Sequence, residues 1–348
     1  VHTTVVGAQH SPDVAMDANG NFIVVWGSAT FSSATSGIYA QRFDSNGNPV
    51  GGEFKVFGVP SRLSVAMAPD GRFVIAYNDG NSSQISAKRY DAGGNELPPP
   101  PGMPLEVGNA FIVKTGPPFT FPVSRFRPEV AMDANGNFII VWEDRTGQDG
   151  SEFGIFAKRY DAAGNEIPPP PGVQGSGVGN EFQVNSFTSF SQTVPAVAMG
   201  PDGSFVITWW SYLQDGGFDA VVAKRYDSMG NELAPSSGTQ GCGVGNEFQV
   251  NTFEQQWFNP GPGDNVQHPA GVAMAANGGF VIAWDGGRGQ DCSSSGVFAK
   301  RYDSSGNELS PPSGTQGLGI GNEFQVNSRG ALPQGPQDVA MSPAGNFV

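Results

Sequence analysis

Apolar residues along this chain recur as two short runs on either side of a turn. The segment Val130–Trp142 reads VAMDANGNFIIVW, and its Asn-Gly pair predicts a tight hairpin, because glycine tolerates the positive φ that such turns require. Closely similar segments occur at Val14–Trp26, Val65–Tyr77, Val197–Trp209 and Val272–Trp284, and another begins at Val339. The chain is therefore expected to consist of repeated antiparallel hairpins.

One full repeat, Glu129 to Asn185, contains four apolar segments. In Phe138–Trp142 the apolar side chains do not alternate with polar ones, and this pattern predicts a strand that is buried on both faces. Further strands are expected at Gly154–Tyr160 and Glu181–Val184. Four antiparallel strands with a doubly covered second strand are typical of a β-propeller blade, whereas a separate β-sandwich in each repeat would need roughly 100 residues.

We therefore expect an all-β fold, a single β-propeller over residues 1–348. Complete four-stranded blades are expected at about 13–57, 64–114, 129–186, 196–252 and 271–328, with partial blades at 1–7 and 338–348. The aromatic residue that ends each second strand is expected to pack between blades. Because the sixth repeat breaks off, we expect six or more blades in a native chain that is longer than this one.

The composition restricts the partners that this protein can have. The chain has 50 glycines and 28 prolines, and only 14% of its residues are charged; this composition favours many tight turns between short strands. The net charge of −14 argues against nucleic acid, which needs a basic surface, and no apolar run is long enough for a membrane-spanning helix. Cys242 and Cys292 lie in Gly- and Ser-rich loops, and we expect a disulfide between them, with two free thiols as the alternative.

Long connections between the expected blades carry aromatic residues on one face of the array. Exposed aromatic side chains beside polar ones suit the stacking of sugars or a protein partner, and the alternative is that these loops fill the central tunnel. The candidate ligand-binding residues are Phe119, Phe121, Phe126, Phe187, Phe190, Trp257, Phe258 and His268.

Acidic loops follow the second strand on the same face, and they are the candidate metal sites. Calcium prefers carboxylate and carbonyl oxygens, so we consider calcium at Asp144 with Asp149 and at Asp285 with Asp291, against solvated carboxylates as the alternative. The DANGN turn is interpreted as a hairpin rather than a metal loop. Arg42, Arg89, Arg159, Arg225 and Arg301 recur in the third strand and are interpreted as part of the blade's construction.

Candidate catalytic residues are scarce in the sequence. Only three histidines are present, and neither a GxSxG elbow nor a Ser/His/Asp set stands out. Paired carboxylates for glycoside cleavage remain open, because their separation is a property of the folded chain. We assign no catalytic residue from the sequence.

The segments VAMDANGNFIVVW and GIYAQRFDSNGNPVGGEFKV resemble the repeat of large secreted bacterial proteins, including adhesin-like and calcium-binding repeat proteins. This resemblance covers nearly the whole chain, and it implies a propeller-like array at the cell surface or outside the cell. It implies no defined activity. The Pro-rich insertions after the third strand depart from the short GNPVG linker of the first repeat.

From these features we expect a non-enzymatic extracellular or cell-surface propeller. Its expected role is that of a scaffold or protein-interaction module, within an envelope or filament assembly, with protein partners or surface glycans and no cofactor beyond calcium. One alternative is a lectin-like propeller that binds carbohydrate through the aromatic loops. A second alternative is a glycoside hydrolase that uses acidic loops.

Overall fold

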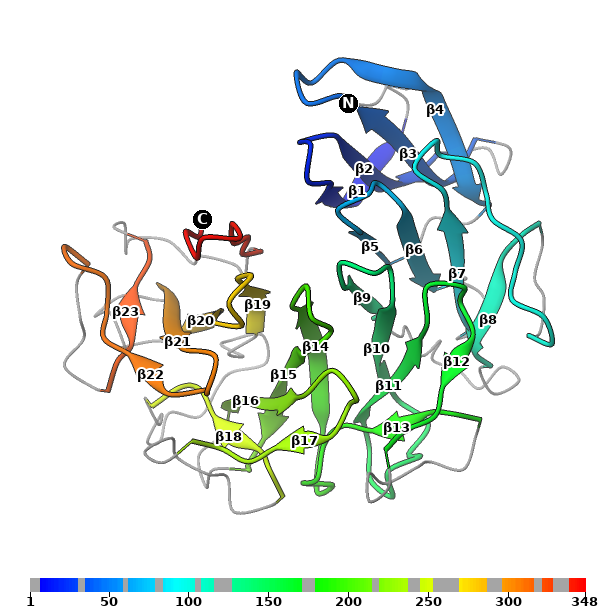
Figure 1. The fold of residues 1–348 in the computed structure, drawn as a ribbon. Helices are drawn as coiled ribbons and strands as arrows, with labels where there is room; N and C mark the ends of the chain where they lie inside the picture. The colour runs from blue at the N-terminus through cyan, green and yellow to red at the C-terminus, as the bar shows by residue number, and fades with distance from the viewer. Residues whose placement is uncertain are drawn as a thin grey trace. The chain divides into compact units, whose positions relative to one another are not determined.

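The computed structural model describes thirteen segments of the chain, and all of its regular elements there are β-strands (Figure 1). The described residues are 7–30, 35–58, 62–78, 84–103, 108–115, 127–170, 179–214, 219–236, 245–252, 269–286, 296–315, 321–327 and 338–348. The expected partial blade at 1–7 lies almost wholly outside them.

The strands form five antiparallel sheets that follow one another along the chain. The first sheet contains β1 (Ala8–Met16), β2 (Phe22–Ala29), β3 (Gly37–Phe43) and β4 (Pro49–Phe57), and the second contains β5 (Leu63–Met67), β6 (Phe73–Asn78), β7 (Ile85–Tyr90) and β8 (Phe111–Lys114). The third contains β9 (Glu129–Met132), β10 (Phe138–Asp144), β11 (Gly154–Tyr160), β12 (Glu166–Ile167) and β13 (Phe182–Gln183).

The fourth sheet contains β14 (Gln192–Met199), β15 (Phe205–Tyr212), β16 (Asp219–Tyr226), β17 (Glu232–Leu233) and β18 (Phe248–Gln249). The fifth contains β19 (Pro269–Met274), β20 (Phe280–Gly286), β21 (Gly296–Tyr302), β22 (Glu308–Leu309) and β23 (Phe324–Gln325). The first three strands of every sheet lie side by side in chain order. The expected all-β fold of four-stranded antiparallel blades is confirmed.

The insertions after the third strand divide the fourth strand of the later blades into two short pieces. In the first blade β4 runs unbroken along β3, although its register shifts twice. In the fourth blade the insertion separates β17 from β18, and both pieces pair with β16. The insertion therefore interrupts only the fourth strand of the blade, and the first three strands stay continuous.

The DANGN segments are hairpin turns that their own aspartates stabilise. In the third blade the Asp133 carboxylate accepts hydrogen bonds from the backbone N–H of Asn135 and of Asn137, each at 2.8 Å. Gly136 has a φ of 86° and donates its N–H to the Asp133 carbonyl. The aspartate thus closes a turn, as interpreted from the sequence, because its oxygens accept from the turn's backbone and from the Asn137 amide.

The core lies between neighbouring blades, where the second strands are covered on both faces. Tyr77, Trp142, Trp209 and Trp284 are each 0% exposed, which confirms that these recurring aromatic residues are packing residues. In the first two blades, Ile23 and Val25 of β2 pack in one cluster with Ile75 of β6. The fourth and fifth blades meet in a similar cluster.

Recurring arginines such as Arg89 and Arg225 bond to the turn of the next blade. Arg89 donates to the Ala162 carbonyl at 3.2 Å and to the Pro98 carbonyl at 2.9 Å. Arg225 repeats the pattern with the Ser304 and Ala234 carbonyls. The guanidinium is therefore used in the blade's own construction, as expected.

The chain divides into two compact units, and the division passes through the third blade. The first unit comprises Val1–Thr146, Ala157–Pro169 and Gly177–Glu181, and the second comprises Gly147–Phe156, Pro170–Ser176 and Phe182–Val348. The expectation of one domain over 1–348 stays a prediction. At the end of the second unit, Val339, Met341 and Phe347 pack against the fifth blade as the beginning of a further hairpin.

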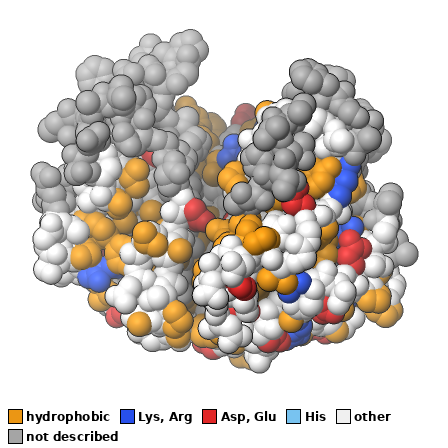
Figure 2. Space-filling model, turned by 90° about the horizontal axis from the view of Figure 1, so that it is seen from above, with side chains coloured by type: hydrophobic (Ala, Val, Ile, Leu, Met, Phe, Trp, Pro, Cys, Tyr) orange, Lys and Arg blue, Asp and Glu red, His pale blue; other side chains and the backbone are white. Residues whose placement is uncertain are grey.

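Charged side chains on the face drawn in Figure 2 lie scattered among apolar and neutral ones. Within the described segments, no helix is long and apolar enough to cross a membrane.

Candidate functional site

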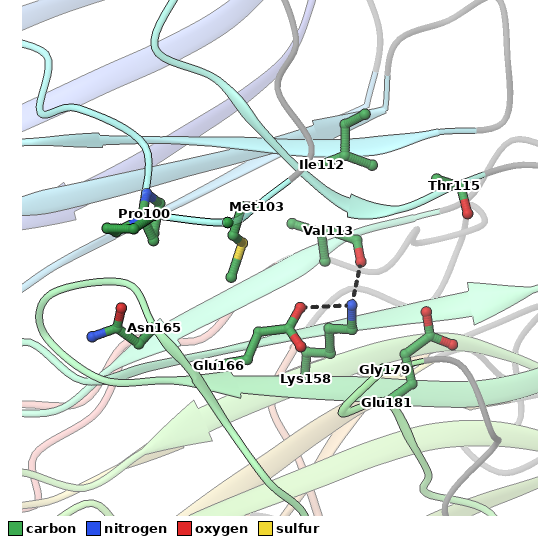
Figure 3. Close-up of a pocket in the computed structure, with 12 residues that line it drawn as sticks. Pro100, Met103, Ile112, Val113, Thr115, Lys158, Asn165, Glu166, Gly179 and Glu181 are labelled. Carbon is green, nitrogen blue, oxygen red and sulfur yellow. Dashed lines mark hydrogen bonds and ion pairs between the residues drawn. The ribbon is translucent and has the colours of Figure 1, made fainter.

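A pocket of about 440 Å³ opens in the first unit, between the fourth strand of the second blade and the third blade (Figure 3). This volume falls within the range of small-molecule pockets, which is roughly 300–1,000 Å³. One wall is apolar and the other carries charge. Its lining residues are Pro100, Pro101, Gly102, Met103, Ile112, Val113, Thr115, Lys158, Asn165, Glu166, Gly179 and Glu181.

The blade architecture and one insertion together place these residues. Ile112 and Val113 belong to β8, Lys158 to β11 and Glu166 to β12, while Glu181 directly precedes β13. Pro100 to Met103 belong to the insertion after the third strand of the second blade, and Figure 3 shows Pro100 and Met103 facing the charged wall. The insertion therefore contributes the apolar wall, which the first blade's short linker has no residues to build.

Lys158 is the centre of the charged wall. Its Nζ donates to the Glu166 carboxylate at 2.8 Å and to the Val113 carbonyl of the preceding blade at 2.9 Å, and Figure 3 draws both bonds. The other Glu166 oxygen accepts from the Asn180 amide at 3.1 Å. The ammonium group is almost fully buried, and these partners replace the water that burial removes.

Glu181 lies deeper in the wall and is held by a second lysine. The Lys114 Nζ is 3.3 Å from a Glu181 oxygen and 3.3 Å from a carboxylate oxygen of Asp144. The Asp144 contact is an ion pair rather than a well-aligned hydrogen bond, and the same side chain accepts from the Thr146 N–H at 2.7 Å. Two buried carboxylates thus share one buried ammonium group. Because each of the two oxygens is 3.3 Å from the Lys114 Nζ, the distance between them is at most the sum of these two distances.

Glu166 and Glu181 also act on one phenol, which places them in the same neighbourhood. Burial, and then the negative charges of Glu166 and Glu181, raise the pKa of Tyr160 well above its ordinary value. Tyr160 is stacked on Phe138, with ring centroids 4.7 Å apart. The two carboxylates therefore lie near a buried aromatic pair that is not part of the pocket lining.

Part of this arrangement recurs in the other blades. Lys88 with Glu96, Lys224 with Glu232 and Lys300 with Glu308 form ion pairs equivalent to Lys158 with Glu166. The residues equivalent to Glu181 are Glu53, Ala110, Glu247 and Glu323. The repeated lysine–glutamate pair is a construction feature of the blade.

The surroundings of Glu181 differ from those of its counterparts. Glu247 accepts from the backbone N–H groups of Ser186 and Phe187, and from the Gln214 side chain. Lys114 occupies the position at which Asn185 and its counterparts Asn251 and Asn327 bind a backbone N–H of the third strand. The Lys114–Asp144–Glu181 group is therefore specific to the junction of the second and third blades among these described positions.

Glu247 and Glu323 predict how stability depends on pH. Burial raises the pKa of both carboxyls from the ordinary value of 4.5, although Lys224 and Lys300 oppose the rise. The folded chain then binds these protons more tightly than the unfolded chain, so their contribution to stability is complete below pH 4.5 and lost as pH rises through the raised pKa values. Urea denaturation at a series of pH values should therefore give a shallower decline toward neutrality for Glu247→Gln than for the wild type. Identical slopes would contradict this assignment.

The structure describes only two of the predicted aromatic ligand-binding residues. Phe187 is partly buried, and Phe190 is 47% exposed at the beginning of the fourth blade. The others, Phe119, Phe121, Phe126, Trp257, Phe258 and His268, lie outside the described residues. A role of these side chains in ligand binding stays a prediction.

The predicted metal ligands have partners of their own in the described structure. Asp144 is paired with Lys114, and Asp149 accepts from the Ser151 N–H at 3.0 Å. Asp285 is buried on β20, and Asp291, Cys242 and Cys292 lie outside the described residues. Among the residues that are described, no group of three or more His, Cys, Asp or Glu side chains could hold a metal ion. Calcium binding and the disulfide stay predictions.

The sequence analysis did not select Lys158, Glu166, Glu181 or Lys114. A signal was present, because the lysine of AKRYD precedes the glutamate of GNE by eight residues in the last four repeats. That regularity identifies the repeated ion pair, but it does not reveal the pocket.

Comparison with known proteins supports the fold more strongly than any relationship by descent. No protein-family model and no curated protein sequence matches the chain. Among solved structures, a GH93 α-L-arabinofuranosidase of Fusarium graminearum, in complex with arabinobiose, is similar with a TM-score of 0.52 and 9% identity, over 96% of this chain and 84% of that one. A protein of unknown function from Dyadobacter fermentans gives a TM-score of 0.50 and 11% identity, over 96% and 87% of the two chains. A Penicillium chrysogenum α-L-arabinanase gives 0.49 and 11%, over 84% and 77%.

The expectation that the chain is not an enzyme is contradicted by a solved structure of the same fold, the GH93 α-L-arabinofuranosidase, which is a glycoside hydrolase. The expectation rested on the absence of a catalytic motif in the sequence. In a propeller, the carboxylates of one pocket come from separate strands and insertions, so their proximity is not visible in the order of residues. At 9% and 11% identity, the two structures with TM-scores of 0.52 and 0.50 show similarity of fold alone, namely the β-propeller architecture.

Proposed function

We propose that this protein is a glycoside hydrolase whose substrate enters the pocket between the second and third blades. The observation that carries the proposal is the pair of carboxylates, Glu166 and Glu181, on one wall of a cavity of about 440 Å³. Most glycoside hydrolases use two carboxyl groups, one as acid and one as base or nucleophile. The fold shared with an arabinofuranosidase supports the proposal without assigning the sugar.

We assign different roles to the two carboxylates. Glu166, which Lys158 holds at 2.8 Å, acts as the base or nucleophile. Glu181 supplies the acid that protonates the leaving oxygen. Lys158 also contacts the Val113 carbonyl, so it fixes the position of Glu166 against the opposite wall.

The remaining lining residues favour a neutral sugar. Met103 and Val113 offer an apolar surface to the C–H face of a sugar ring, and Thr115 and Asn165 offer hydroxyl and amide groups. A net charge of −14 disfavours polysaccharides rich in uronic acids, because like charges repel during approach.

The test is a panel of neutral aryl glycosides, arabinofuranosides included, assayed with the wild-type chain and with Glu166→Gln. Turnover of at least one glycoside is expected, and Glu166→Gln should lower it by about 10²–10⁴-fold, the usual contribution of a positioned acid or base. Glu308→Gln is the matched control, because it breaks the equivalent ion pair with Lys300 in the fifth blade. Silence of the wild type across the panel would overturn the proposal, as would equal activity of the two variants.

A location outside the cell or at its surface, and membership in the resembling repeat proteins, remain proposals that rest on the repeated sequence alone. An extracellular location would suit a hydrolase of polysaccharides.

A further inference from the structure

Three aromatic side chains form a surface at one end of the fourth blade, in the second unit. Trp210 and Tyr212 stand two residues apart on β15, so they lie on the same face of the strand, and their ring centroids are 5.9 Å apart. Phe190 meets Tyr212 edge to face at 5.9 Å, with an interplanar angle of 89°. Phe190 is 47% exposed and the other two are partly exposed, so the rings cover one another only in part.

The backbone around this aromatic surface is held in an unfavourable conformation. Phe190, Val194 and Leu213 have φ values of 62°, 53° and 60°, in the left-handed region that side chains with a Cβ rarely adopt. Strain of this kind persists where the surrounding structure enforces it, and it concentrates at binding and catalytic sites. An exposed phenylalanine gains little burial in return for such strain, so packing alone does not account for Phe190.

Hydrogen bonds from a neighbouring loop enforce the conformation. The Ser151 hydroxyl donates to the Phe190 carbonyl at 2.8 Å, and the Ser191 hydroxyl donates to Glu152 at 2.7 Å. The Tyr212 N–H donates to the Ser191 carbonyl at 3.1 Å. The segment that carries Phe190 is thus fixed to both β15 and the loop before β11, so the ring is presented in one position.

Polar groups surround the aromatic surface. Glu152 and Ser189 are exposed, and Ser191 and Gln214 are partly exposed. An apolar peptide would remove these polar groups from water and offer them no further hydrogen bonds, whereas a sugar ring presents C–H groups to the aromatic faces and hydroxyl groups to the rim.

We propose that Phe190, Tyr212 and Trp210 form a carbohydrate-binding site that stacks a neutral sugar ring of a polysaccharide. The choice of ligand class rests on the proposed function, but the site itself is separate from the pocket lined by Glu166 and Glu181. It binds the polymer without taking part in hydrolysis.

Affinity electrophoresis of the full chain in gels that contain arabinan, xylan or β-glucan tests the proposal. The wild type should be retarded in at least one gel, and Phe190→Gly and Tyr212→Ala should each weaken binding by tenfold or more. Met229→Ala is the control, because Met229 is an exposed apolar residue of the same blade, outside the aromatic surface. Phe190→Gly should melt at the same temperature as the wild type or higher, because glycine relieves the positive φ.

The outcomes separate this site from the proposed hydrolase. Retardation that depends on Phe190, in a chain that cleaves no aryl glycoside, would support the binding site and contradict the hydrolase. A wild type that no gel retards would overturn the site, even if the chain cleaves glycosides. Unchanged binding by Phe190→Gly, or a clear fall in its melting temperature, would also overturn it, since the latter would mean that the ring only stabilises the fold.

Discussion

Replacing Glu181 by glutamine is expected to lower kcat, on any glycoside that the wild type cleaves, by about 10²–10⁴-fold with the fold intact. Glutamine has the shape of glutamate and still accepts a hydrogen bond from Lys114, which lies 3.3 Å from the carboxylate. It cannot transfer a proton to the leaving oxygen. Because Glu181 is only 1% exposed, the chemistry of its carboxyl group is the property that the substitution removes.

The kinetic constants and the melting temperature should be measured together for Glu181→Gln and for Glu247→Gln. Glu247 is the positional counterpart of Glu181 in the fourth blade, but it accepts from backbone N–H groups and from Gln214, whereas Glu181 accepts from Lys114. We expect a loss of kcat only for Glu181→Gln. An equal loss in both variants would mean that the two residues serve the blade's structure.

Replacing Lys114 by methionine is expected to lower the free energy of unfolding by about 3–5 kcal/mol, the usual cost of removing one partner from a buried ion pair. Asp144 is 0% exposed and Glu181 is 1% exposed, so neither carboxylate can recover its hydration in the folded chain. Urea denaturation of the wild type and the variant measures the loss. Lys114→Met should be among the most damaging single changes in the first unit.

The control for this prediction is a triple variant, Lys114→Met with Asp144→Asn and Glu181→Gln. Neutral amides have a much smaller desolvation cost than carboxylates, so the triple variant should recover most of the lost stability. A Lys114→Met variant within about 1 kcal/mol of the wild type would contradict the ion-pair assignment, since surface pairs contribute no more than that.

These two substitutions distinguish the repeated part of the site from the part that occurs at one junction. The lysine–glutamate pair in each of the later blades bonds strands together, and its removal in the fifth blade should leave activity unchanged. At one junction Lys114 pairs with Glu181 and Asp144, and the insertion with Met103 adds a wall to the pocket that Glu181 lines. The lysine–glutamate pair occurs in several blades, and it lines a candidate site at the junction of the second and third blades because the residues around it differ there.

The blade could be predicted from the residues alone, because hairpin turns and doubly buried strands depend on local residues and on burial. Gly136 has the positive φ that the Asn-Gly pair requires, and Trp142 is buried as its repeated position indicated. The recurring Arg89 and Arg225 likewise proved to be construction residues. Residues that recur from blade to blade serve the packing and hydrogen bonding that the blades have in common.

The residues that meet at the pocket and at the aromatic surface could not be predicted in this way, because the folded chain brings them together. The sequence pattern predicted a loop at Asp144, but the structure places this residue at the end of β10, buried against Lys114 of the preceding blade. Trp210 and Tyr212 lie on one strand, and Phe190 joins them because the fold places its ring against Tyr212. Contacts between blades join residues that are tens of positions apart, and the energy of each contact depends on burial and partner geometry, which the order of residues does not contain.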